Sequence, residues 1–270
     1  MAGSKPQLGA PTVYPDHYDP GLLVAIPRAQ GRAQLHLPGN MAGADLWTAF
    51  EVSWLTPGGK PQVAVAEFRV PCTSPNIVES KSFKLYLNSL NQTCFATWDE
   101  VVAVLARDLG GGFGAAIGVK LFTVDDYGAL GVTRMEGSCL DSLEIDCANF
   151  HPDGGLLALR AEAGVDERVY SHLLKTNCPV TGQPDWATLA IAYRGRGICH
   201  RGLLRYLVSF RQHQDFHEHC VERIFADILS QCAPEYLSVY ARYTRRGGLD
   251  INPFRSTHDE QPPWCRIARQ

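Results

Sequence analysis

Two short segments stand out in the hydrophobic pattern because larger apolar side chains alternate with alanine. Residues 63–68 (VAVAEF) and residues 189–193 (LAIAY) each follow a Gly-x-Pro turn, at 59–61 and 182–184. A period of two is typical of a strand that buries one face. Both segments are therefore predicted to be strands that begin just after a turn.

A helical spacing follows each of these strands. Residues 84–90 (KLYLNSL) match residues 204–210 (LRYLVSF), with Tyr, Leu and Ser coinciding 120 residues apart. Phe83, Leu87 and Leu90 fall on one side of a helix, and the second copy repeats this spacing. Each half is therefore predicted to contain a helix with one buried face.

A second helix and a closing strand complete each half. Thr97 with Glu100, and Asp215 with Glu218, have the spacing of a capping box before the apolar runs 101–105 and 221–225. These runs are followed by the predicted strands 119–124 and 237–243. The order strand, helix, helix, strand thus occurs twice.

This repeated order predicts an α+β protein made of two tandem modules. Each module is expected to be an antiparallel sheet with a pair of helices on one face. We place the boundary after residue 148, giving an N-terminal module 1–148 and a C-terminal module 149–270. The first 45 residues are rich in Pro and Gly and are predicted to be an extension over the folded body.

Composition and charge exclude several classes of protein. The 270 residues carry a net charge of −3, with 45% hydrophobic and 20% charged residues, as in ordinary globular proteins. No apolar run approaches the roughly 18 residues of a membrane span, and the start lacks a secretory signal. We expect no membrane association and no direct binding to nucleic acid.

The nine cysteines indicate a reduced compartment. Their number is odd, their spacing is wide and none forms a C-x-x-C pair. A disulfide framework and a zinc knuckle are therefore not expected, and the protein is predicted to be cytoplasmic. Most of these thiols should be small buried residues.

Cys178 is the cysteine with a possible chemical role. It lies between Asn and Pro in a polar turn, and Asp185 follows across that turn. Backbone amides and nearby cations can favour a nucleophilic thiolate in such a turn, and a carboxyl group can deliver a proton. The alternative is an inert loop cysteine beside a turn aspartate.

Three polar stretches admit more than one interpretation. Residues 213–220 (HQDFHEHC) are dense in ligand-type side chains but lack the H-E-x-x-H pattern, so capping or recognition of a purine-like ring is favoured over a metal. The glycines 110–114 follow a helix rather than a strand and are predicted to be a helix stop and loop, not a dinucleotide site. Residues 79–82 and 245–248 can each be structural or bind a phosphate.

Together these stretches resemble the NADPH-dependent 7-cyano-7-deazaguanine reductases, the nitrile reductases of queuosine biosynthesis. The residues that carry the resemblance are ESKSFKLY at 79–86, NC at 177–178 with QPDW at 183–186, DFHE at 215–218 and RG at 246–247. The resemblance spans nearly the whole chain and is to the long, two-module type. It implies two tunnelling-fold modules per chain, and a homodimer built from sheets joined around a tunnel.

The resemblance also assigns roles to individual residues. It implies that Cys178 attacks the nitrile carbon to form a thioimide and that Asp185 donates a proton. Substrate contacts are assigned to Val78, Glu79, Ser80, His217 and Glu218. Contacts to NADPH are assigned to Ser80, Lys81, Arg246 and Gly247. The resemblance also implies two NADPH per turnover and no metal.

Two other functions remain possible from the residues. A cyclohydrolase-like enzyme of the same fold would act on a pterin or purine and hold zinc through Cys and His. A ligand-binding module without catalysis would bind the nitrile without a covalent adduct. The presence of both Cys178 and Asp185 favours the reductase.

Overall fold

The computed structural model describes residues 14–263 and 265–270 of the chain. The chain forms two compact units. Of the described residues, unit 1 contains 14–31, 45–131 and 245–250, and unit 2 contains 32–44, 132–244, 251–263 and 265–270. Strands β2 (Ala42–Leu55) and β10 (Leu249–Ser256) pass from one unit into the other.

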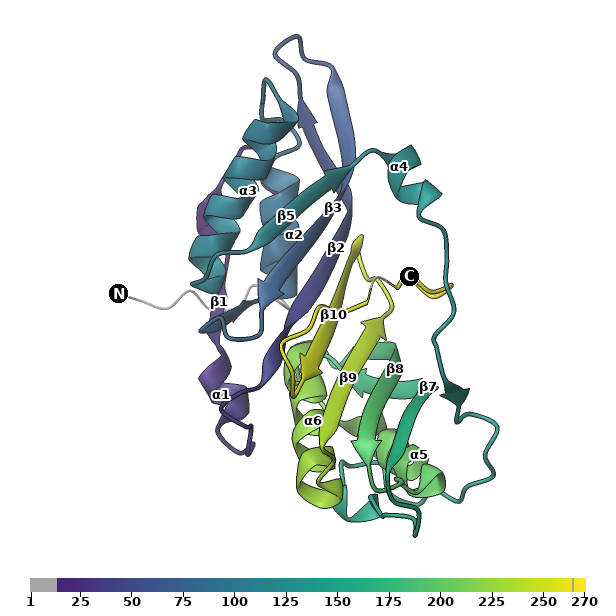
Figure 1. Ribbon diagram of the computed structural model, residues 1–270. Helices are drawn as coiled ribbons and strands as arrows, with labels where there is room; N and C mark the ends of the chain where they lie inside the picture. Colours follow the sequence, from purple (N-terminus) through teal and green to yellow (C-terminus); the bar gives the residue numbers. More distant parts are fainter. Residues whose placement is uncertain (1–13, 264) are drawn as a thin grey trace. The chain divides into compact units, whose positions relative to one another are not determined.

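Unit 1 is a sheet covered by helices on one face (Figure 1). Its strands follow the order β5-β3-β2, and β1 pairs separately with β4. Helices α2 and α3 cover the sheet. The other elements of this unit are β1 (Ala25–Pro27), β3 (Pro61–Pro71), β4 (Asn76–Val78), β5 (Gly118–Phe122), α2 (Ser80–Ser89), α3 (Trp98–Phe113), α4 (Val124–Ala129) and the 3₁₀ turn Pro20–Leu22, with α1 (Arg28–Arg32) at its edge.

Unit 2 repeats this plan (Figure 1). Its strands follow the order β10-β9-β8-β7-β6, antiparallel except for the parallel pair of β6 with β7. Its remaining elements are β6 (Ser138–Cys139), β7 (Val165–Asn177), β8 (Pro184–Gly195), β9 (Tyr236–Tyr243), α5 (His200–Ser209), α6 (His217–Cys232) and the 3₁₀ turns Gly154–Leu156 and Phe210–Gln212.

The predicted helices and strands are confirmed, and their apolar faces form the cores. Phe83 and Leu90 of the first copy, like Leu203 and Phe210 of the second, are fully buried. Residues at positions i, i+4 and i+7 share one side of a helix, which packs against the sheet. The spacing read from the sequence therefore fixes which face each helix turns inward.

The same hydrogen bonds occur in both units and support the duplication. The Tyr86 hydroxyl donates to Asp108 Oδ2 at 2.7 Å, and Tyr206 donates to Asp227 Oδ2 at the same distance. In each copy a serine three residues further along donates its hydroxyl to the tyrosine carbonyl at 2.6 Å. The repeated Tyr thus ties together the two helices of each unit, and the repeated Ser bonds within its own helix.

Two local expectations are wrong, the first only in part. The stretch 110–114 does end the helix, since Gly114 is the C-cap with a left-handed φ of 72°, but residues 110–112 are not loop: α3 continues to Phe113. The buried Leu109 and Phe113 outweigh the poor helix propensity of the glycines. The second capping box is also absent, since Phe216 is the N-cap of α6 and makes no side-chain cap bond.

The Thr97 cap of α3 is confirmed, and the reciprocal bond of the capping box is displaced by one residue. Thr97 Oγ1 accepts from the Glu100 amide at 3.2 Å, and the Glu100 carboxylate accepts from the Ala96 amide at 2.7 Å. The α+β class with an antiparallel sheet and a helix pair in each unit is confirmed as well. The boundary after residue 148 stays a prediction, supported by a repeated Asp-capped 3₁₀ turn at 20–22 and at 154–156.

The expected extension over the first 45 residues is only partly described. Residues 1–13 lie outside the described part, whereas residues 25–32 already form β1 and α1 and β2 begins at Ala42. Among the helices of the described residues, none has the length and apolar character needed to cross a bilayer.

Candidate active site

Cys178 lies in the turn that joins β7 to β8 in unit 2. The backbone closes this turn twice, with the Cys178 amide donating to the Gln183 carbonyl at 2.9 Å and the Gly182 amide donating to the Cys178 carbonyl at 3.0 Å. Gly182 has a φ of 68°, a conformation that glycine adopts without strain. Asp185 stands opposite Thr176 in the ladder, so the turn holds the thiol and the carboxylate near each other.

The segment that leads into α6 pairs with the end of β7. The Asn177 amide donates to the His213 carbonyl at 2.8 Å, and the Asp215 amide donates to the Asn177 carbonyl at 3.2 Å. This pairing fixes the start of α6 beside the Cys178 turn. Both His217 and Glu218 lie in the first turn of that helix, where backbone amides favour a negative charge.

Asp185 and His217 form a buried pair within this site. His217 Nε2 lies 3.3 Å from Asp185 Oδ1, and the two side chains are 11% and 3% exposed. The imidazole stacks on the Tyr243 ring, with centroids 3.7 Å apart and planes within 2°. Strand β9 therefore fixes the orientation of a ring that contacts the carboxylate.

Some polar atoms of the site are open to a ligand. The buried Nδ1 of His217 has no hydrogen-bond partner among the described residues. Burial of a polar atom without a partner is costly, so such atoms mark places where a bound molecule completes the bonding. The edge of a purine-like ring offers suitable donors and acceptors.

The turn makes Cys178 more acidic than an ordinary cysteine. Its half-buried position and the charge of Asp185 raise the pKa, but hydrogen bonds from the Thr181 hydroxyl and the Thr181 and Val180 amides outweigh them. The net effect is a pKa of Cys178 below the usual value. The thiolate is the nucleophilic form, so the turn prepares this residue for attack on an electrophilic carbon.

Removal of the Thr181 hydroxyl should slow the reaction of Cys178. In Thr181→Val the thiolate loses a donor, so the pKa rises and a smaller fraction of the thiol is ionised at neutral pH. We expect the pH profile of Cys178 alkylation, measured by peptide mass spectrometry, to move to higher pH with several-fold slower labelling at neutral pH. Thr181→Ser keeps the hydroxyl and should follow wild type; an unmoved profile in Thr181→Val would contradict the role of this donor.

The predicted residues of unit 1 surround the start of α2. The Glu79 carboxylate caps this helix, accepting from the Lys81 amide at 2.8 Å and the Ser82 amide at 2.7 Å. Val78 and Glu79 are each 2% exposed, and Ser80 is half-buried. Glu79 thus has a structural role beside the substrate contact predicted for it, and a carboxylate retains lone pairs for a further donor.

A cavity of about 290 Å³ in unit 1 brings together two residues predicted to bind the cofactor. Lys81 and Gly247 line it, together with Lys84 one helical turn along α2. A Cβ atom on Gly247 would lie 3.3 Å from the Lys84 ammonium nitrogen, so the glycine leaves room for that side chain. The Glu51 carboxylate lines the same cavity. The two ammonium groups outnumber it and can bind a phosphate, so the donor set fits the phosphate part of NADPH.

Arg246 precedes Gly247 and does not line this cavity. Its amide donates to the Leu249 carbonyl at 2.9 Å, which closes the turn that holds Gly247. Sequence reasoning missed Lys84, although it falls in the ESKSFKLY stretch on the same helix face as Lys81. A three-residue spacing of lysines was the signal that could have identified it.

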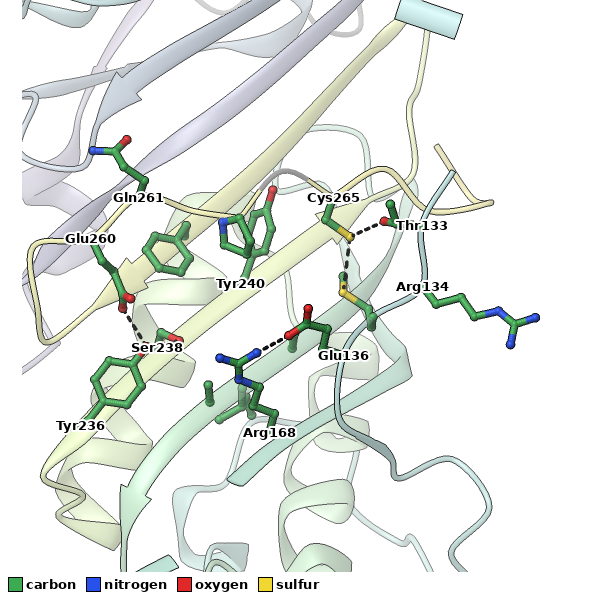
Figure 2. A pocket seen from close by; sticks show the side chains of 16 residues that line it. Thr133, Arg134, Glu136, Arg168, Tyr236, Ser238, Tyr240, Glu260, Gln261 and Cys265 are labelled. Atoms are coloured by element: carbon green, nitrogen blue, oxygen red, sulfur yellow. Dashed lines mark hydrogen bonds and ion pairs between the residues drawn. The ribbon is translucent and has the colours of Figure 1, made fainter. Parts of the chain in front are cut away.

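A larger cavity in unit 2, of about 360 Å³, contains none of the predicted site residues (Figure 2). It lies over β8, β9 and β10, between residues 133–136 and residues 260–265. Its lining includes an ion pair between Glu136 and Arg168. It also includes a hydrogen bond that the Tyr236 hydroxyl donates to Glu260. The candidate chemistry therefore lies at the Cys178 turn rather than in the larger cavity.

Comparisons with known proteins show the family of the chain. A family model described as nitrile reductase, 7-cyano-7-deazaguanine-reductase N-term, matches residues 14–121, and one described as QueF-like protein matches residues 184–262. A protein of Bordetella parapertussis is 52% identical over 273 residues, covering 100% of both chains. The chain belongs to the 7-cyano-7-deazaguanine reductase family.

That relative, and one from Burkholderia multivorans that is 54% identical over 97% of both chains, are each named NADPH-dependent 7-cyano-7-deazaguanine reductase. The family resemblance read from the sequence is thereby confirmed. Within unit 2, Cys178, Asp185, His217 and Glu218 all lie around the β7–β8 turn and the start of α6. The roles of these residues stay predictions, as do those of the unit 1 residues.

Sequence reasoning missed Tyr243 and Thr181. Tyr243 belongs to a predicted strand with no polar motif around it, and only the folded structure places its ring under His217. Thr181 stands inside the Cys178 turn, where hydroxyl residues commonly bond to nearby groups, so its position was a usable signal.

Proposed function

We propose that this chain reduces the nitrile of 7-cyano-7-deazaguanine to the primary amine 7-aminomethyl-7-deazaguanine with NADPH, a step of queuosine biosynthesis. The observation that carries this proposal is Cys178, which has a lowered pKa in a turn beside the buried Asp185–His217 pair. A thiolate nucleophile with an adjacent carboxyl group suits addition to a carbon–nitrogen triple bond.

Cys178 begins the proposed reaction. Its thiolate forms a bond to the nitrile carbon, and the nitrogen takes a proton from Asp185, giving a thioimide on the enzyme. This addition turns a poor hydride acceptor into a better one, so covalent catalysis divides a difficult reduction into easier steps. A first hydride from bound NADPH, with a proton on nitrogen, would give a thiohemiaminal. Loss of the Cys178 thiolate would leave the protonated imine, which would take the second hydride to give the amine.

The Asp185–His217 pair is positioned to handle the protons. The carboxylate contacts an imidazole whose ring is fixed by Tyr243, so a proton lost from Asp185 can be replaced along this contact. Burial of both side chains excludes water and limits hydrolysis of the covalent intermediate. No step of this scheme uses a metal.

The deazaguanine ring is proposed to bind at the start of α6. Glu218 would accept ring N–H groups, and His217 would contact the ring with the nitrogen that has no partner among the described residues. Charge-assisted hydrogen bonds in a buried site provide strong discrimination. The substrate contacts of Val78, Glu79 and Ser80, and the homodimer, remain predictions.

Product analysis tests the proposed function directly. Purified protein incubated with 7-cyano-7-deazaguanine and NADPH should yield the aminomethyl product, with two NADPH oxidised for each amine formed. Mass spectrometry of the product and absorbance of NADPH give both quantities. Substrate binding without any amine would support a binding module instead, and a hydrolysed pterin or purine would support a cyclohydrolase.

Removal of a lysine ammonium group in the unit 1 cavity should weaken cofactor binding. In Lys84→Ala or Lys81→Ala one charge that would face a phosphate is lost, and we expect the KM for NADPH to rise about tenfold while kcat stays near wild type. Lys60→Ala, on the exposed β2–β3 turn, is the matched control and should change neither constant. An unchanged KM for NADPH in both cavity variants would show that NADPH does not bind in this cavity.

A further inference from the structure

A cysteine, an aspartate and a histidine outside the candidate active site share one face at the edge of the unit 2 sheet. In the parallel ladder Cys139 stands opposite Tyr170. Asp141 follows in the turn after β6, where its carboxylate accepts from the His172 amide at 3.1 Å. Leu140, between the two ligand-type residues, is 2% exposed and points into the core.

The potential ligand atoms of these three residues lie close together. The Cys139 sulfur, an Asp141 carboxylate oxygen and a His172 ring nitrogen are all within 4.8 Å of one another. Zinc ligands at 2.0–2.3 Å in a tetrahedron are separated by roughly 3.5 Å, so small rotations about side-chain bonds are enough to close the site. Cys139 is exposed and has room for such a rotation.

Buried neighbours hold two of these side chains in place. The Asp141 carboxylate accepts from the Ser171 hydroxyl at 2.6 Å and from the His172 amide at 3.1 Å. His172 Nδ1 lies 2.8 Å from the hydroxyl of the fully buried Thr188, which leaves the other ring nitrogen for a metal. Such outer hydrogen bonds are typical of metal sites, because they fix the orientation of the ligands.

We propose that Cys139, Asp141 and His172 bind one Zn²⁺, with water as the fourth ligand. A thiolate and an imidazole exclude Mg²⁺ and Ca²⁺, which take oxygen ligands, and suit zinc. Thiolate and carboxylate together balance the charge of a dication. Binding releases the Cys139 proton to solvent as the sulfur–zinc bond forms.

The bound metal would anchor a weakly held edge of unit 2. Strand β6 has only two residues, and the Leu140 amide donates to the Tyr170 carbonyl at 2.9 Å just beyond it. Residues 133–136, immediately before β6, form one wall of the larger cavity in Figure 2. The bound zinc ion would therefore order this wall of the cavity. The zinc ion takes no part in the chemistry at Cys178.

Cobalt spectroscopy of the full-length protein tests the site. Metal-free protein titrated with Co²⁺ should show tetrahedral d–d bands and a thiolate-to-cobalt charge-transfer band that saturate at one equivalent and disappear on addition of Zn²⁺. Cys139→Ser should lose the charge-transfer band, and Asp141→Asn and His172→Asn should each bind at least about tenfold more weakly.

Two other cysteines serve as controls. Cys94→Ser removes another exposed thiol and should keep the full spectrum, and Cys178→Ala should keep it as well. A wild-type protein without the charge-transfer band, or a band that survives in Cys139→Ser or vanishes in Cys178→Ala, would overturn the proposal.

Hydrogen exchange gives a second measurement that does not depend on the spectrum. Zn²⁺ should slow exchange of the amides in residues 133–141 of wild type and leave the same amides unchanged in Cys139→Ser. Equal melting temperatures of the two metal-free proteins would show that the variant is folded. Zinc protection of residues 133–141 that persists in Cys139→Ser would likewise overturn the assignment.

Discussion

Cys178→Ala should abolish both the covalent adduct and turnover. Without the sulfur no thioimide forms, and the nitrile carbon remains a poor hydride acceptor, so we expect a loss of at least about 10⁴-fold in kcat. Intact-protein mass spectrometry with 7-cyano-7-deazaguanine and no NADPH should show the mass of one substrate added to wild type. The variant should show none.

The Cys178→Ala experiment needs a control for general loss of a thiol. Cys147 is also half-buried in unit 2 and has no assigned role, so Cys147→Ala should form the adduct and turn over as wild type does. Addition of NADPH should remove the adduct from wild type and from this control. An adduct that persists in Cys178→Ala would contradict the assignment of the nucleophile.

Asp185→Asn should slow reduction while substrate binding remains. The amide keeps the shape of the side chain and can still contact His217 Nε2, but it cannot donate a carboxyl proton to the nitrile nitrogen. General acid catalysis contributes typically 10²–10⁴-fold, so we expect kcat to fall by about that factor. The dissociation constant of the substrate, measured by calorimetry, should change little.

Asp215→Asn is the matched control for Asp185→Asn. Asp215 lies near the same helix start, where it accepts from the Phe216 amide at 2.8 Å and contacts His219 Nδ1 at 3.2 Å. No proton transfer is assigned to Asp215, so Asp215→Asn should retain most of kcat. Unchanged turnover in Asp185→Asn would show that Asp185 is not the general acid. An equal fall of kcat in both variants would indicate a structural effect.

Much of the fold was predictable because the signals are local. A period of two at residues 63–68 and a helical period at residues 203–210 depend only on neighbouring residues, and burial of the apolar face follows from them. The duplication was visible for the same reason, since Tyr86 and Tyr206 repeat a packing position. The glycines 110–112 misled the prediction because packing of Leu109 and Phe113 overrides local propensity.

By itself the sequence determined the order of elements, their buried faces and the family motifs that contain Cys178, Asp185 and Glu218. Only the tertiary structure decided which distant residues meet: His217 on Tyr243, Lys84 beside Gly247, and Cys139 with His172. The physical reason is that such contacts depend on strand register and on how a helix packs on its sheet. A shift of one residue in strand register would turn these side chains to the opposite face, and a shift of one residue along a helix would rotate them by about 100°, and no local pattern records either.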